Sequence, residues 1–406
     1  MPVFCPGRLG GEPSKVCVYG YGGEQLSESD PNQWTDDLCE VSVWRGEGRI
    51  LFYAQGPVSW SMEADRTFTH TRNPYSEYGY YFLTEGEDSQ SNAQPTAVHP
   101  VATEEPIETT PAYCLYEVDD YAWFHGGRKL VESYDFLNGS VRSYPLQPTF
   151  AAHPLHDAAL DVCFTHNGST TTSVAVAMNG VSVGALTLGA IGGHDEAAES
   201  TRSFSVDLDE ANAQQKVTLT HHRGAGVSGR LDYLRLNYTR FIDTNIPIYA
   251  TSSGIHTYRI GNAGVWDSED VAVWRITDAS SIEPIAYDKT TSTFTADGQR
   301  GDVFIAFDTK GTYPVPEVVG EIANQDLHAT PTTDYIIIVP SSGKLTAQAE
   351  RLAALHRARR GLTVKVVRAD EVYNEFSSGT PDATAYRRYM KMLYDRAETT
   401  AEATSP

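Results

Sequence analysis

The hydrophobic pattern of the chain changes near residue 331, and this change constrains the fold more than any other feature. Up to about residue 325, short runs of β-branched and aromatic residues alternate with turns, as in Arg49–Tyr53, which leads into Gly56-Pro57, and in Gly79–Thr84. From Tyr335 onward an apolar run, a helical stretch and a second apolar run follow one another. This order predicts a mainly β protein that continues into an α/β unit.

Several runs before residue 325 have the alternation and the turn residues of β-strands. Residues 173–183 predict a β-hairpin, because Asn179-Gly180 supplies the two positive-φ residues of a type I′ turn. Residues 231–238 alternate apolar and polar side chains from Leu234 on, which predicts a half-buried strand. Two further strands are predicted, the second after a turn at Asp297-Gly298: residues 271–274 and 303–307. Such short strands with Gly-rich turns are typical of β-sandwiches and jelly rolls.

A β-α-β unit is predicted from Tyr335 onward. Residues 335–339 form a continuous apolar run, the pattern of a strand buried on both faces of a sheet. A helix follows from Leu345 to Arg360, with Gly361 as its C-cap, and then a second strand over residues 362–367. The predicted apolar stripe of this helix is Leu345, Ala349, Leu352, Ala353 and His356. The two strands are expected to be parallel and joined by a right-handed crossover.

A second helix is predicted to begin near residue 380. Thr380 is a suitable N-cap, Pro381 suits the first helical position, and Asp382 complements the positive end of the helix dipole. The apolar stripe of this helix comprises Tyr386, Tyr389, Met390 and Leu393. Two strands and two helices do not complete a doubly wound sheet, so the α/β domain is expected to be cut short.

These patterns divide the chain into four predicted parts. They are an N-terminal β domain with a linker (residues 1–110), a jelly-roll-like β-sandwich (111–245), a small β domain (246–325) and the truncated start of an α/β domain (326–406). The linker is the polar, Pro-containing stretch 85–110. The charge distribution supports the last boundary: residues 331–406 carry 11 Lys and Arg against 9 Asp and Glu, whereas the whole chain has a net charge of -22.

The composition excludes several classes of protein. With 40% hydrophobic and 11% aromatic residues, the chain can bury real cores. No apolar run approaches the ~20 residues of a membrane-spanning helix. The strongly negative net charge disfavours phosphate backbones, so no nucleic-acid partner is expected. The first residues lack the apolar core of a signal peptide, so the protein is expected either to be cytoplasmic or to lack its true N-terminus.

No complete catalytic motif is present in the sequence. Cys163 and His166 lie three residues apart, which places them on opposite faces of a strand, so a buried thiol and an edge histidine are expected rather than a catalytic pair. His125-Gly126-Gly127 is predicted to be a structural turn. His221-His222, next to Arg223, resembles a metal or anion site but is assigned to a solvent-exposed loop.

The cysteines do not form a metal-binding pattern. Cys5, Cys17, Cys39, Cys114 and Cys163 are widely spaced, with no Cys-x-x-Cys pair. Buried or unreactive thiols are expected, although a secreted protein could pair two of them and the spacing does not say which.

Two groups of side chains leave a binding role open. The acidic clusters 117–120 and 267–270 could bind calcium through oxygen ligands, but neither has EF-hand spacing and solvated turns are expected. No other cofactor is indicated. Four tryptophans could form a sugar-stacking platform, although core positions are expected: Trp60, Trp123, Trp266 and Trp274.

The α/β region resembles the beginning of the catalytic domain of gingipain-type cysteine peptidases. The resemblance covers residues 324–340 (NQDLHATPTTDYIIIVP) and 349–397, and it is most specific from Tyr373 to Asp382, followed by Ala385 and Arg387. Four upstream segments are also similar to the family: residues 52–57, 73–84, 231–240 and 265–270. Within the family, the chain is most similar to the sortase-like peptidase of the type IX secretion system of Bacteroidetes.

The resemblance implies a cysteine peptidase or transpeptidase at the outer membrane and cell surface. It implies removal of C-terminal sorting domains from exported cargo proteins and attachment of the cargo to anionic lipopolysaccharide, alongside outer-membrane components of the secretion system. In the family, the catalytic His and Cys lie further along the α/β domain than residue 406. No catalytic or metal-binding residue of this chain is therefore assigned, its binding residues stay unassigned, and this portion is expected to be inactive alone.

A secreted multi-domain β-sandwich protein, either a glycan-binding protein or an adhesin, is the alternative. It would use exposed aromatic side chains to contact glycans. Under either hypothesis the last ~75 residues are expected to be the least stable part, because their half-sheet exposes an apolar edge and face.

Overall fold

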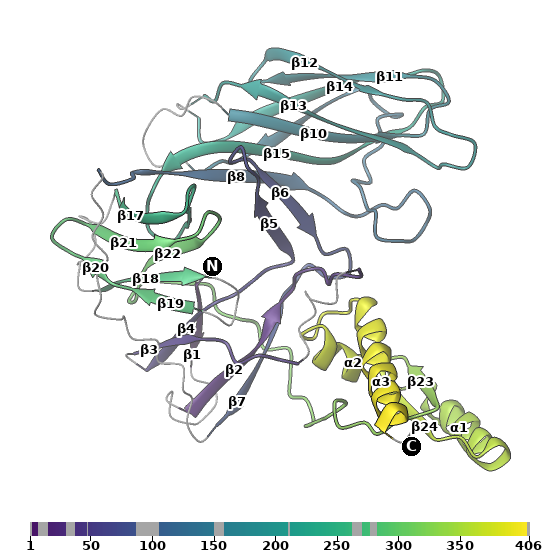
Figure 1. Cartoon of the computed structure of the whole chain (residues 1–406). Helices are drawn as coiled ribbons and strands as arrows, with labels where there is room; N and C mark the ends of the chain where they lie inside the picture. The colour runs from purple at the N-terminus through teal and green to yellow at the C-terminus, as the bar shows by residue number, and fades with distance from the viewer. Residues whose placement is uncertain are drawn as a thin grey trace.

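The computed structural model describes residues 2–6, 15–29, 37–46, 48–86, 105–149, 158–209, 212–261, 270–276 and 282–403. Antiparallel sheets make up most of this part of the chain, and three helices lie together near its C-terminal end (Figure 1). The fold is therefore mainly β, followed by the start of an α/β unit, as predicted. Within the described residues, no helix combines the length and the apolar character needed to cross a membrane.

The largest unit is a sandwich of two four-stranded antiparallel sheets with the orders β13-β10-β15-β8 and β12-β11-β14-β9. Its strands are β8 (Thr109–Glu117), β9 (Val141–Leu146), β10 (Ala158–His166), β11 (Thr172–Met178), β12 (Val181–Leu188), β13 (Ala198–Val206), β14 (Gln215–His222) and β15 (Gly229–Phe241). Counted from β8 as the first strand, the two sheets have the orders 6-3-8-1 and 5-4-7-2, which is the jelly-roll arrangement. The predicted hairpin is confirmed, because Asn179 (φ 51°) and Gly180 (φ 84°) join β11 to β12.

Strand β15 differs from its prediction, because it is buried on both faces along most of its length. The inner face contributes Leu234 and Leu236 to the sandwich core. The outer face is covered by the hairpin of β5 (Val58–Met62) and β6 (Phe68–Arg72), whose Phe68 N–H donates to Asn237 Oδ1 at 2.8 Å. A strand covered on its second face by a distant hairpin cannot be distinguished by local alternation from a half-buried one.

The N-terminal region forms small sheets that lie below the sandwich in the view of Figure 1. One has the order β1-β4-β3, and β2 pairs with β7. These strands are β1 (Pro2–Pro6), β2 (Val16–Gly22), β3 (Val43–Gly46), β4 (Arg49–Tyr53) and β7 (Tyr80–Glu85). The strands predicted at 49–53 and 79–84 are thus present, whereas residues 87–104 of the predicted linker lie outside the described residues.

A further pair of sheets has the orders β16-β22-β18-β19 and β17-β21-β20. The strands are β16 (Pro247–Tyr249), β17 (Gly254–Arg259), β18 (Val271–Ile276), β19 (Ile282–Ile285), β20 (Tyr287–Asp288), β21 (Thr293–Gly298) and β22 (Val303–Asp308). Both predicted strands are present as β18 and β22. The turn prediction was wrong, because Asp297-Gly298 ends β21 and the reversal lies between Gln299 and Asp302, whose N–H donates to the Gln299 carbonyl at 3.0 Å.

The α/β unit contains the predicted parallel pair, β23 (Tyr335–Val339) and β24 (Val364–Arg368), joined by α1 (Thr346–Arg360). Gly361 ends α1 in the left-handed region (φ 65°), as predicted. The apolar stripe was only partly right: Ala349 and Ala353 are buried, but Leu345 and Leu352 are 52% and 40% exposed. Strand β23 is likewise not buried on both faces, because the helices of the described chain cover only part of the two-stranded sheet.

The remaining helices are α2 (Ala369–Phe376), which the sequence analysis missed, and α3 (Thr384–Ala403). Helix α3 begins later than predicted, because Thr380 and Pro381 lie in the preceding turn and the Thr384 N–H donates to Asp382 Oδ1 at 2.8 Å. Of the predicted stripe, Tyr389 and Leu393 are buried, whereas Met390 is exposed. The core of this unit joins helices α2 and α3 to β24: Val367, Val372, Phe376, Ala385, Tyr389 and Leu393, with Leu327.

Candidate functional site

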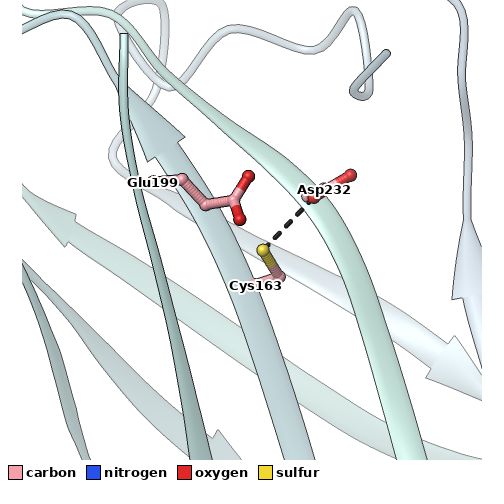
Figure 2. Close-up of side chains that lie close together, drawn as sticks. All are labelled: Cys163, Glu199 and Asp232. Carbon is pink, nitrogen blue, oxygen red and sulfur yellow. Dashed lines mark hydrogen bonds between the residues drawn. The ribbon is translucent and has the colours of Figure 1, made fainter. Parts of the chain in front are cut away.

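An acidic cluster lies on the outer face of the β13-β10-β15-β8 sheet. Cys163 in β10, Glu199 in β13 and Asp232 in β15 come from three adjacent strands, and Figure 2 shows their side chains close together. The register between β10 and β15 shifts after Cys163, which leaves Asp232 as the extra residue of a β-bulge. The bulge brings the Asp232 carboxylate to the side of Cys163, and one potential ligand atom from each of the three residues lies within 4.8 Å of the others.

Lys129 neutralises part of this acidic cluster. Its ammonium lies 3.0 Å from Asp232 Oδ2 and also pairs with Glu199. The Cys163 thiol donates to the same Asp232 oxygen at 3.2 Å, and burial, followed by the Asp232 charge, raises the pKa of the thiol. A thiol with a raised pKa is neither an activated nucleophile nor a ready thiolate ligand for zinc. Cys163 is therefore a structural hydrogen-bond donor in this arrangement.

Glu117 and Asp119 form the other side of the cluster, and each brings an oxygen within 4.8 Å of Asp232. Their side chains are only 8% and 10% exposed, so the solvated turn predicted for residues 117–120 was wrong for these two and right only for exposed Asp120. Burial raises the pKa of Asp119 to about 7, with the nearby Glu117 charge as the second cause and Arg72 opposing it. Residues 267–269 of the other predicted acidic cluster lie outside the described residues.

Cys163 and His166 lie on opposite faces of strand β10, as the sequence predicted, and therefore do not form a catalytic pair. His166 is completely buried on the inner side of the sandwich, where its ring contacts the Gly189 carbonyl (Nε2, 2.6 Å) and the Thr172 hydroxyl (Nδ1, 3.1 Å). The expectation of an edge histidine was therefore wrong. Of the cysteines whose side chains the structure describes, Cys17 and Cys163 are buried, Cys114 is partly buried and Cys39 is exposed.

The prediction of a solvent-exposed loop was wrong for His221, which lies at the end of strand β14. Its side chain is buried against the rings of Phe136 and Phe164, while the neighbouring His222 points outward. The apolar partners of His221 come from strands and loops distant in sequence, which explains why a His-His-Arg triplet resembled a polar loop. The two histidines face opposite ways and do not form a joint metal site.

The buried His221 is expected to make the fold sensitive to acid. Burial, then the charges of His166, Arg223 and His222, lower its pKa to about 4, whereas Asp135 opposes them. Because an unfolded histidine has a pKa near ~6.5, the unfolded chain binds more protons between pH about 4 and about 6.5. Stability should fall as the pH drops through that window, and His221→Phe should flatten the decline in urea unfolding. His222→Phe is the control, and an equal effect of both variants would contradict this assignment.

The other candidate motifs have structural roles where they are described. His125-Gly126-Gly127 is an exposed turn, as predicted. Trp274 is buried, Trp60 stacks on Tyr113 with ring centroids 3.6 Å apart, and Trp123 donates to the Thr165 hydroxyl. Trp266 lies outside the described residues. The three described tryptophans of the proposed platform therefore make intramolecular contacts, and they do not form one stacking surface.

The most specific family-like stretch, Tyr373–Asp382, contacts the N-terminal strands. The Ser378 hydroxyl donates to the Tyr80 carbonyl at 3.0 Å and accepts from the Tyr21 N–H at 3.1 Å. Asp382, which is completely buried, accepts from the Leu26 N–H at 3.0 Å. These side chains hold the turn before α3 against residues more than 290 positions away in the sequence.

Arg128 connects this contact to the jelly-roll unit. Its guanidinium lies 3.4 Å from Asp382 Oδ1 and 3.1 Å from Glu28 Oε1, and it donates to the Tyr75 hydroxyl at 3.0 Å. The next residue is Lys129, which pairs with the acidic cluster. One loop of the jelly roll therefore contacts both the cluster and the α/β unit, a link that residue patterns alone did not reveal.

Comparisons with known proteins support the family resemblance. Residues 328–405 match the model of peptidase family C25. A crystal structure of dimeric latent PorU from Porphyromonas gingivalis matches with a TM-score of 0.84 and 25% identity, over 100% of this chain and 39% of that chain. The chain thus spans less than half of the PorU chain. A carbohydrate-binding module CBM36 in complex with calcium and xylotriose (16% identity, 24% of this chain, 71% of that chain) has a TM-score of only 0.18, too low to carry an argument. No curated protein matches the chain.

The α/β unit is similar to peptidase family C25, and with the jelly roll and the smaller sheets it makes the chain a gingipain-type, PorU-like protein. The likeness to PorU extends along its whole length.

Proposed function

We propose that the chain is the N-terminal portion of a PorU-like cysteine peptidase of the type IX secretion system. The complete enzyme would cleave C-terminal signals from exported proteins and link those proteins to surface lipopolysaccharide. The observation that carries this proposal is the match to PorU over 100% of the chain, which includes the β units as well as the α/β start. A glycan-binding protein would not be expected to match in this way.

This portion would act as the scaffold on which the peptidase domain is built. Its partners would be cargo proteins with C-terminal sorting domains, outer-membrane components of the secretion system and anionic lipopolysaccharide, at the cell surface. The support is the polar contact between the N-terminal strands and the turn before α3, through Ser378 and Asp382. Such a contact orients the first elements of the α/β unit relative to the β domains.

The proposal predicts that the isolated chain has no peptidase activity. We expect no cleavage of a substrate carrying a C-terminal sorting domain and no labelling by thiol-directed peptidase inhibitors, because Cys163 is buried beside Asp232 and its thiol stays protonated. Cys→Ser variants of each of the five cysteines are the controls. Turnover that disappears in any one of them would refute the proposal, as would a gene without downstream segments encoding the family His and Cys.

A further inference from the structure

We propose that Glu117, Asp119 and Asp232 form a calcium-binding site on the outer face of the jelly roll. The site lies where β8 ends beside the bulge of β15, so the fold brings together two carboxylates close in sequence and one more than 110 residues away. This inference does not depend on the proposed peptidase function.

The first argument is that buried carboxylate oxygens in this place lack hydrogen bonds. Glu117 Oε2 and Asp119 Oδ1 are inaccessible to solvent and accept no hydrogen bond from the described residues. Both hydrogen bonds to Asp232, from Lys129 and Cys163, end on Oδ2. Buried carboxylate oxygens are costly unless they are paired or coordinate a metal. One oxygen from each of the three residues lies within 4.8 Å of the others, a separation that a shared cation can bridge.

The second argument is the charge balance. Four carboxylates face the cluster, those of Glu117, Asp119, Glu199 and Asp232, whereas the cations are Arg72 and Lys129. Arg72 is also shared with the exposed Glu77, and its contacts with Asp119 (3.4 Å) and Glu117 (3.9 Å) are long.

His70 adds no positive charge to the cluster. Its Nδ1 accepts a hydrogen bond from Arg235 at 3.0 Å, so the ring is neutral with its proton on Nε2, which lies 3.4 Å from Glu117. When all four carboxylates are ionised, two negative charges are thus left without a matching cation, which is the charge that one divalent ion supplies.

The donor set indicates which ion would bind. Glu117, Asp119 and Asp232 offer only carboxylate oxygens, which hard cations such as Ca²⁺ prefer. Carboxylates from a strand end, a loop and a bulge can adopt the irregular geometry that Ca²⁺ accepts and Mg²⁺ does not. The neighbouring group of Cys163 and Glu199 is less suited to a metal, because Lys129 already pairs with Glu199 and with Asp232 Oδ2.

Calorimetric titration of the full chain with Ca²⁺, after removal of metals with EDTA, tests the site. We expect one Ca²⁺ per chain, with a Kd no weaker than about 1 mM, the upper end of the range for extracellular modules, and a higher melting temperature with Ca²⁺ than with equal Mg²⁺. The double variant Glu117→Gln/Asp119→Asn keeps the side-chain shapes and should weaken Ca²⁺ binding about tenfold or more. Asp119→Asn alone should weaken it less, and it is informative if the double variant does not fold.

Glu77→Gln is the matched control, because Glu77 is an exposed carboxylate that contacts the same Arg72. It should bind Ca²⁺ with unchanged affinity. The proposal is overturned if the wild-type chain shows no binding up to about 10 mM Ca²⁺, if the Glu117 and Asp119 variants bind as tightly as wild type, or if Glu77→Gln loses as much affinity as they do.

Discussion

Asp382→Ala is expected to destabilise the attachment of the α/β unit by about 3–5 kcal/mol, one of the two largest effects predicted for this chain. The Asp382 carboxylate is completely buried and accepts hydrogen bonds from the N–H groups of Leu26 (3.0 Å) and Thr384 (2.8 Å). Its Oδ1 also faces the Arg128 guanidinium at 3.4 Å. The substitution leaves two buried N–H groups without an acceptor and removes a charge partner of Arg128.

Hydrogen exchange localises this effect. In Asp382→Ala, the amides of residues 364–393 should exchange faster. Those of the jelly-roll strands should stay as protected as in the wild type, because Asp382 contacts the jelly-roll unit through Arg128, which lies in a loop. Asp395→Ala is the control in the same helix, since Asp395 is exposed and forms an ion pair at i,i+4 with Lys391. Equal exchange in the two variants would contradict the proposed role of Asp382.

The same experiment tests the expectation that the last ~75 residues are the least stable part. The α/β unit has its own core, but Leu345, Leu352 and Met390 are exposed on its helices. Segments with few buried apolar contacts open locally at low free energy. In the wild type, residues 334–397 should therefore exchange faster than the jelly-roll strands. Equal protection of the two regions would contradict this prediction.

The elements that the sequence predicted well are those whose signals are local. Asn179-Gly180 defines a hairpin by its own backbone conformation, and Gly361 ends α1 for the same reason. Helix α2 was missed because its eight residues are too short to establish a helical period against the neighbouring strand. The start of α3 was misplaced because Asp382, rather than Thr380, supplies the acceptor for the first free N–H group.

Residues 117–120 were recognisable as acidic in the sequence, but their approach to Asp232 could not be predicted, because it depends on tertiary structure. Asp232 lies in a bulge of β15 beside Cys163, and a register shift of this kind leaves no clear local pattern. Glu117 and Asp119 were predicted to be solvated because no residue near them in the sequence covers them. In the structure they are covered by Arg72, which lies at the end of the β5–β6 hairpin. The sequence signal that could have indicated burial is weak: acidic residues directly after an aromatic strand.

The hairpin that covers this face is itself held by one buried carboxylate. Asp161 Oδ2 accepts hydrogen bonds from Arg235 Nε (3.0 Å) and Nη2 (2.9 Å), and from Asn237 Nδ2 (3.1 Å). Arg235 in turn donates to His70 in β6, and Asn237 accepts from the Phe68 N–H. Asp161 therefore organises the side chains by which the jelly roll binds the β5–β6 hairpin.

Asp161→Ala is expected to lower the free energy of unfolding by about 3–5 kcal/mol, because it leaves the buried Arg235 guanidinium without its anion. Urea unfolding followed by tryptophan fluorescence measures the loss, and Trp60 in the hairpin reports on its detachment. Asp207→Ala, an exposed carboxylate just after β13, should change stability by less than about 0.5 kcal/mol.

A double variant separates the unpaired charge from a loss of packing. Asp161→Ala/Arg235→Met removes both ions and keeps an unbranched side chain of similar length against the hairpin, so it should recover much of the stability lost in Asp161→Ala. Recovery would identify the stranded guanidinium as the main cost of the single substitution. If the double variant is less stable than Asp161→Ala, then Arg235 contributes chiefly through its contact with His70 Nδ1 and its stem, and the ion pair is not what holds the hairpin on the sheet.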